Sequence, residues 1–143
     1  MCGIVGYIGS KEPKDVLLEG LKNLEYRGYD SAGIALRNDS QVQIIRGLGR
    51  ISCLEEKINN MDVIKANMGI AHTRWATHGK PNESNAHPHK SGKVTLVHNG
   101  IIENFSELKE RLIKEGVKFN SDTDSEVMTA LINYYYDGDP VLA

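Results

Sequence analysis

The sequence predicts a single domain in which α-helices and β-strands alternate. Its 143 residues match the usual size of one domain. Short apolar stretches rich in β-branched residues alternate with segments whose apolar residues recur at helical spacing. The composition, 40% hydrophobic and 25% charged, is ordinary for a globular protein. We therefore expect a mixed helix-and-strand fold without internal repeats.

The first third of the chain predicts a strand, a helix and a hairpin. The strand spans Gly3–Ile8, and Pro13 lies in the first turn of the helix that follows. Four apolar side chains share one face of this helix: Val16, Leu17, Leu21 and Leu24. After a polar loop at 25–31, strands at 32–36 and 42–46 flank an Asn-Asp-Ser turn and form the hairpin.

The middle of the chain predicts a short helix and two strands. The helix covers 51–58, and we expect Cys53 on its buried side. The strands cover 68–75 and 94–97, and the segment between them, 76–92, has no regular pattern but is rich in histidine and asparagine.

Two further helices are predicted from their capping residues. The first begins after Asn104, an expected N-cap with Glu107 three residues later, and ends at Gly116. Thr123 and Glu126 form a second capping box. The apolar face of the second helix consists of Val127, Ala130, Leu131 and Tyr134.

Charge and cysteine content exclude several classes of protein. With 19 acidic and 17 basic residues, the net charge of −2 argues against a general binder of nucleic acid or of membrane surfaces. No apolar run approaches the roughly 20 residues of a membrane span, and the start lacks the features of a signal peptide. Two cysteines, Cys2 and Cys53, make no disulfide framework, so we expect a cytoplasmic protein.

The chain start, Met1-Cys2-Gly3, is the first candidate for chemistry. Removal of Met1 would leave Cys2 with a free α-amine, whose reference pKa of roughly 7.7–8.0 suits a base for the thiol beside it. The alternatives are that Cys2 is a small buried hydrophobic residue or that Met1 is retained. In the latter case the nitrogen is an amide and cannot act as a base.

The five histidines invite a metal hypothesis, because all of them fall in one part of the chain: His72, His78, His87, His89 and His98. Their spacing matches no common zinc motif, and neither cysteine is near them in sequence. A metal-dependent hydrolase therefore ranks last among the functions considered, and we expect no metal and no cofactor.

Three other sites carry suitable groups for substrate binding. Arg74, at a strand end, suits a carboxylate, although an ion pair within the fold is the alternative. Asn99-Gly100 offers a side-chain amide and a backbone N–H side by side, as an oxyanion hole requires, or forms a tight turn. Asp124 begins a capped helix, where a carboxylate can simply complement the helix dipole.

Four motifs in this order resemble a known family: residues 1–6 (MCGIVG), 24–33 (LEYRGYDSAG), 72–79 (HTRWATHG) and 98–104 (HNGIIEN). Together they closely resemble the glutaminase domain of the glutamine–fructose-6-phosphate aminotransferase family, which belongs to the amidotransferases with an N-terminal cysteine nucleophile. The resemblance covers the chain to about Tyr136.

The resemblance implies an α+β fold, a four-layer αββα sandwich of the N-terminal-nucleophile hydrolase type, incomplete at the C-terminal side. It implies that Cys2, freed of Met1, attacks the side-chain amide of L-glutamine and forms a γ-glutamyl thioester, releasing ammonia. Asn99 and Gly100 match the family's oxyanion-hole positions.

The same resemblance assigns five substrate contacts. Arg74 matches the residue that binds the α-carboxylate of glutamine, and Asp124 the residue that binds its α-amine. Thr77 and His78 match further substrate contacts, and Trp75 matches a mobile residue linked to the passage of ammonia.

The family's glutaminase domain is about a hundred residues longer, so 1–143 is expected to be its N-terminal part, without the isomerase domains that would bind fructose 6-phosphate. Full-length members are expected to be homo-oligomers. Missing neighbours would leave open strand edges, so we expect the piece alone to be marginally stable or to self-associate. The alternative function is an inactive glutamine-binding or interaction fragment.

Overall fold

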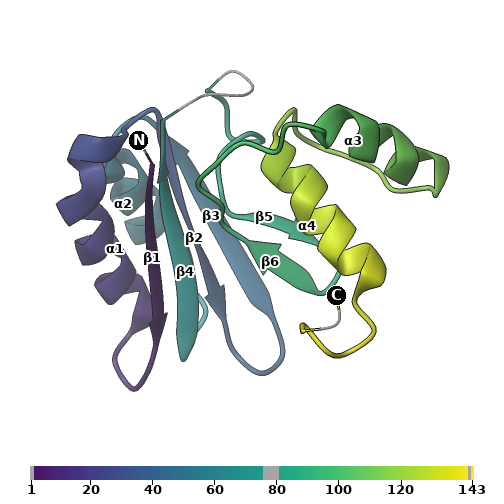
Figure 1. The fold of residues 1–143 in the computed structure, drawn as a ribbon. Helices are drawn as coiled ribbons and strands as arrows, with labels where there is room; N and C mark the ends of the chain where they lie inside the picture. Colours follow the sequence, from purple (N-terminus) through teal and green to yellow (C-terminus); the bar gives the residue numbers. More distant parts are fainter. Residues whose placement is uncertain (1, 76–80, 142) are drawn as a thin grey trace.

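The computed structural model describes residues 2–75, 81–141 and 143. Two antiparallel sheets lie at the centre of the fold (Figure 1). The larger has the strand order β1-β4-β2-β3, and its strands are β1 (Gly3–Ile8), β2 (Ser31–Arg37), β3 (Val42–Leu48) and β4 (Met68–Arg74). The smaller pairs β5 (His89–Ser91) with β6 (Val94–Leu96).

Helices cover the outer faces of both sheets. On one side of the larger sheet lie α1 (Pro13–Leu24) and α2 (Ile51–Asn59), and on the far side α4 (Asp124–Tyr135) packs on β5 and β6 (Figure 1). The remaining helix, α3 (Phe105–Lys114), packs on α4. The layers therefore follow the order αββα, and the predicted α+β sandwich is confirmed.

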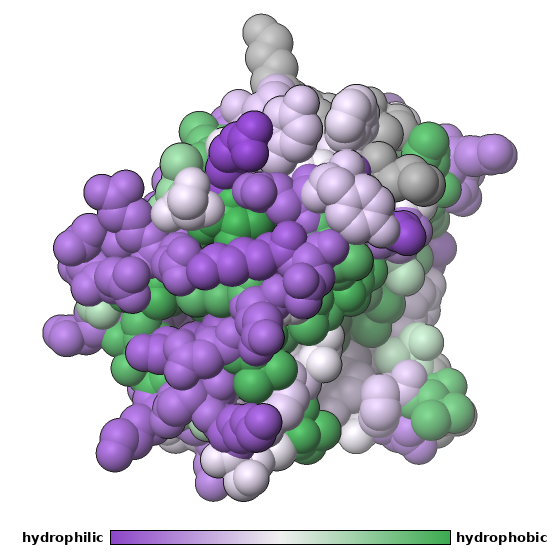
Figure 2. Space-filling model, turned by 90° about the vertical axis from the view of Figure 1, so that its left-hand side faces the viewer, coloured by the Kyte–Doolittle hydropathy of each residue, from purple (hydrophilic) through white to green (hydrophobic). Residues whose placement is uncertain are grey.

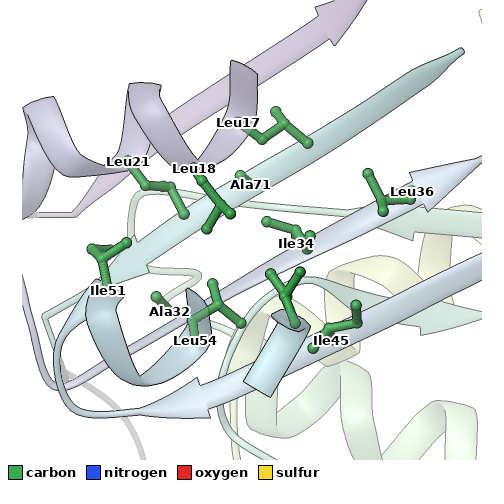
Figure 3. Close-up of a cluster of buried hydrophobic side chains, with 11 residues drawn as sticks. Leu17, Leu18, Leu21, Ala32, Ile34, Leu36, Ile45, Ile51, Leu54 and Ala71 are labelled. Atoms are coloured by element: carbon green, nitrogen blue, oxygen red, sulfur yellow. The ribbon is translucent and has the colours of Figure 1, made fainter. Parts of the chain in front are cut away.

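The main hydrophobic core lies between the larger sheet and its two helices. Leu17 and Leu21 of α1 are fully buried and face Ile34 and Ala71 of the neighbouring strands, while Leu54 closes the core from α2 (Figure 3). Figure 2, which faces the outer side of α1 and α2, shows mostly hydrophilic side chains over this layer. The two helices are therefore amphipathic, as their sequence pattern predicts.

Most predicted elements are confirmed, with shifts of one or two residues at their ends. Three predictions are wrong in detail. Cys53 is exposed, because the buried positions of α2 are Ile51, Leu54 and Ile58. Asn104 precedes α3 but its side chain makes no capping hydrogen bond. The irregular segment contains the short strand β5, which pairs with β6. No helix in the described ranges is long and apolar enough to cross a membrane.

Candidate active site

A polar pocket lies where the chain start, the end of β4 and the start of α4 meet. Cys2, Arg74, Gly100 and Asp124 all line it, although they are far apart in the sequence. Its volume is about 30 Å³, which has room for ordered water but is small for an amino acid. With Trp75, which also lines it, the pocket brings together five of the predicted site residues.

Pairing of β1 with β4 places Cys2 beside the end of β4. Gly3 lies opposite Thr73 in this antiparallel ladder, so the residue before Gly3 meets the residues that follow Thr73. The backbone N–H of Trp75 donates to the Cys2 Sγ atom at 3.1 Å, and the thiol lies 3.6 Å from the Trp75 carbonyl oxygen. The half-buried thiol is thus held by backbone atoms.

Gly28 allows a close approach next to this end of β4. A Cβ atom at position 28 would come within 2.8 Å of the carbonyl group of Arg74. The Thr73 hydroxyl donates to the carbonyl oxygen of Gly28. The N–H of Asp30 donates to the carbonyl oxygen of Arg74 at 3.3 Å. The Arg-Gly-Tyr-Asp loop therefore packs against the end of β4 and is hydrogen-bonded to it.

A buried cation and a buried anion line the same pocket. Arg74 is 4% exposed and ends β4, an inner strand of the larger sheet. Asp124, also 4% exposed, opens α4, where Thr123 caps the helix by accepting a hydrogen bond from the N–H of Glu126. The Oδ2 atom of Asp124 accepts from the N–H of Ile102 at 2.9 Å. Both charges are thus fixed by secondary structure.

Asn99 and Gly100 lie beside Cys2, and Asn99 also contacts His72 of β4. The Asn99 Nδ2 atom donates to the backbone oxygen of Cys2 at 3.2 Å. Gly100 has φ +153°, and a Cβ atom there would lie 2.7 Å from the His98 ring. Only glycine fits this conformation and this contact without strain. The Asn-Gly pair therefore lies next to Cys2, with Asn99 bonded to its backbone and Gly100 lining the pocket.

Three histidines that the sequence analysis did not assign to the site form a buried cluster. The rings of His72 and His87 stack with centroids 4.1 Å apart, and His89 meets His87 edge to face at 4.7 Å. Burial lowers the pKa of His72 to about 4 and that of His89 to about 3, and it lowers the pKa of His87 further. All three rings are therefore neutral at pH 7.

The sequence carries a signal for His72, but not for its contacts with the other two histidines. His72 lies two residues before Arg74 in a strand, and residues at this spacing share one face of a sheet. Within residues 2–75 and 81–141, no group of three or more histidine, cysteine, aspartate or glutamate side chains is placed to hold a metal ion.

The remaining predicted site residues are partly beyond what the structure describes. Trp75 is 52% exposed, and its ring meets Tyr29 edge to face with centroids 6.3 Å apart. Thr77 and His78 fall in 76–80, outside the described residues. Ser125, which the sequence analysis did not single out, lines the pocket and lies 3.1 Å from the His98 Nδ1 atom.

Comparison with known proteins identifies relatives over nearly the whole chain. A protein named glutamine–fructose-6-phosphate aminotransferase (isomerizing) from Clostridium tetani is 56% identical over 141 residues, 97% of this chain and 23% of its own length. A Pyrococcus horikoshii protein of the same name is 58% identical over 134 residues, 92% of this chain and 22% of its length. The chain thus spans about a quarter of these relatives.

Two solved structures share the fold. A structure described as the allosteric regulatory enzyme of purine biosynthesis has a TM-score of 0.81 and 27% identity, covering 96% of this chain and 30% of that one. The glutamine phosphoribosylpyrophosphate amidotransferase of B. subtilis has a TM-score of 0.78 and 28% identity over the same shares. The family model described as a glutamine amidotransferase domain matches residues 58–140. The chain therefore belongs to the glutamine amidotransferase domain family.

Proposed function

We propose that this chain is the N-terminal, nucleophile-bearing part of a glutaminase domain that hydrolyses the side-chain amide of L-glutamine. The observation that carries the proposal is one pocket that holds a cysteine thiol together with a buried cation and a buried anion. A free amino acid has one carboxylate and one ammonium group, so Arg74 and Asp124 would fix these two charged groups and leave the side-chain amide for Cys2.

The reaction begins at Cys2 after Met1 has been removed. Its α-amine takes the thiol proton while the sulfur attacks the amide carbon, and the negative charge moves to the amide oxygen. Asn99 Nδ2 and the N–H of Gly100 would donate to that oxygen. The C–N bond then breaks, the α-ammonium protonates the leaving group, and ammonia departs. Water attacks the thioester, releases glutamate and restores the thiol.

The pocket must widen before glutamine enters, because its volume is about 30 Å³. We propose that Trp75, half exposed beside the thiol, moves when substrate binds and ammonia leaves, and that Thr77 and His78 add substrate contacts.

By analogy with the relatives' names, we propose that the ammonia serves to convert fructose 6-phosphate to glucosamine 6-phosphate. The acceptor would bind isomerase domains outside these residues, in a cytoplasmic homo-oligomer.

The test is the intact mass of the full-length polypeptide before and after incubation with an electrophilic glutamine analogue. We expect loss of Met1 and one adduct mapped to Cys2. Cys2→Ser should abolish both the adduct and glutaminase activity, whereas Cys53→Ser, at the exposed second cysteine, should change neither. A retained Met1, or no adduct on a processed chain, would contradict the proposal and favour an inactive glutamine-binding domain.

A further inference from the structure

His72 makes a contact with Asn99 that the proposed reaction has not yet used. Its side chain is 1% exposed and extends from the central strand β4. The Nε2 atom of the ring lies 2.9 Å from the Asn99 Oδ1 atom. The same Asn99 donates from Nδ2 to the backbone oxygen of Cys2 at 3.2 Å. The two ends of one amide group are therefore fixed by two different elements.

The chemistry of this contact determines which ring nitrogen carries the proton. Because burial lowers the pKa of His72 to about 4, the ring has a single N–H at pH 7. The Asn99 Oδ1 atom only accepts hydrogen bonds, so a bond at 2.9 Å requires the proton on Nε2. We therefore expect His72 to be a neutral donor that carries its proton on Nε2.

The surroundings hold the ring in this position. His72 stacks on His87 with an angle of 18° between the rings. The Nδ1 atom of His87 in turn accepts from the N–H of His98 at 3.3 Å, one residue before Asn99. The stack thus links β4 to the backbone that precedes the Asn-Gly pair.

We propose that His72 is a positioning residue that orients the Asn99 amide so that its NH₂ group, and not its oxygen, faces the reacting carbonyl at Cys2. This inference rests on the proposed glutaminase function. An amide rotated by 180° would present oxygen to the developing oxyanion and repel it. Loss of one oxyanion donor typically lowers the rate by about 10²–10³-fold, and a donor that is only misoriented part of the time should cost somewhat less.

Steady-state kinetics of glutamine hydrolysis by the full-length polypeptide tests the inference. His72→Phe keeps a ring for the stack but removes the donor, so we expect kcat to fall about 10- to 100-fold with little change in KM. His72→Gln restores an N–H and should recover part of kcat. His89→Phe is the matched control, because this ring is equally buried but bonds to Thr123 and not to Asn99; its kcat should fall less.

Three kinetic results would overturn the inference: a wild-type kcat in His72→Phe, no recovery in His72→Gln, or an equal loss of kcat in His89→Phe. The last result would mean that any change in the buried cluster is harmful and that His72 has no special role.

The tautomer of His72 can be measured without any activity assay, so it tests the positioning role independently of the proposed function. Nitrogen NMR of the protein labelled with ¹⁵N-histidine, with the His72 signals assigned by their loss in His72→Phe, should show a neutral ring protonated on Nε2. Protonation on Nδ1 would overturn the positioning role even in an active enzyme. Protonation on Nε2, in a protein whose glutaminase activity does not depend on Cys2, would instead refute the proposed function alone.

Discussion

The two sides of the sandwich bury different kinds of side chain. Around α1 and α2 the core consists of apolar residues such as Leu17 and Leu54. At the start of α4 most of the buried residues are polar. They form two hydrogen-bonded groups, one of Ser121, Thr123 and Glu126 and the other of Asp124, Ser125 and Thr129. One side therefore depends on apolar area, whereas the other combines matched donors and acceptors with a smaller apolar cluster of Leu112, Val127 and Ala130.

Because of this difference, we expect the apolar region to contribute mainly to stability and the polar region to the geometry of the site as well. Apolar contacts are not directional, so a leucine core tolerates small shifts. Buried polar groups must find partners in fixed directions, because an unsatisfied one costs about 1–3 kcal/mol. The polar side is also where Asp124 faces the pocket. We therefore expect changes in the first region to affect mainly stability, and changes in the second to affect substrate binding as well.

The largest effect is expected from Leu17→Ala in the apolar region. Leu17 is fully buried, and such truncations cost about 2–5 kcal/mol. Urea unfolding should show this loss, while KM for glutamine stays near its wild-type value in protein that remains folded. A raised KM would show that the two regions are not separate.

Glu126→Ala should lower the stability of the protein and also weaken the binding of glutamine. The buried carboxylate accepts hydrogen bonds from the N–H groups of Asn120 and Ser121 and from the Ser121 hydroxyl, at 2.6–2.9 Å. Losing them should cost about 1.5–3 kcal/mol and raise KM, since this loop leads into Asp124. Glu115→Ala, at an exposed position, is the control and should stay within about 0.5 kcal/mol. Equal stability of the two variants would contradict the prediction.

Acid should destabilise the protein through its buried histidines. Burial lowers the pKa of His89 to about 3. Below about pH 6.5, His89 is therefore protonated in the unfolded chain but stays neutral in the folded chain. The free energy of unfolding should therefore fall by about 2 kcal/mol per such histidine between pH 7 and pH 5. In His89→Phe this fall should be about 2 kcal/mol smaller. An unchanged pH dependence would show that His89 titrates normally.

The smallest expected effect is the loss of stability when the N-cap residue of α4 or of α3 is replaced. The Thr123 side chain caps α4, whereas the Asn104 side chain makes no capping bond at α3. Thr123→Ala should cost about 1 kcal/mol, and Asn104→Ala should stay within about 0.5 kcal/mol. Thermal unfolding of the two variants measures the difference, and a larger loss for Asn104→Ala would reverse this assignment.

The elements of the fold were largely predictable because their signals are local. Strand β1 has its predicted bounds, and α1 begins at its predicted proline. The errors occur where tertiary contacts decide. A capping pattern at Asn104 does not guarantee a bond, and the three-residue β5 exists only through its pairing with β6.

The residues of the site could be predicted from the sequence, but the contacts between them could not. Composition and spacing alone left Arg74 and Asp124 with alternative roles, and the resemblance to a family assigned them. The contact of His72 with Asn99 could not be predicted, because it joins β4 to a loop that is distant in sequence. The stacking of His72 on His87 likewise arises only when the segment before β5 packs on β4.

The antiparallel ladder between β1 and β4 has a consequence for how this domain tolerates change. Its register fixes Cys2 against the residue after Arg74 whatever the intervening chain does. Insertions at the hairpin tip near Asp39, far from this ladder end, should therefore leave the thiol where it is. A single residue inserted between Cys2 and Gly3 would instead move the nucleophile by a full strand step. The length of the terminus, more than the length of any loop, is what the reaction geometry constrains.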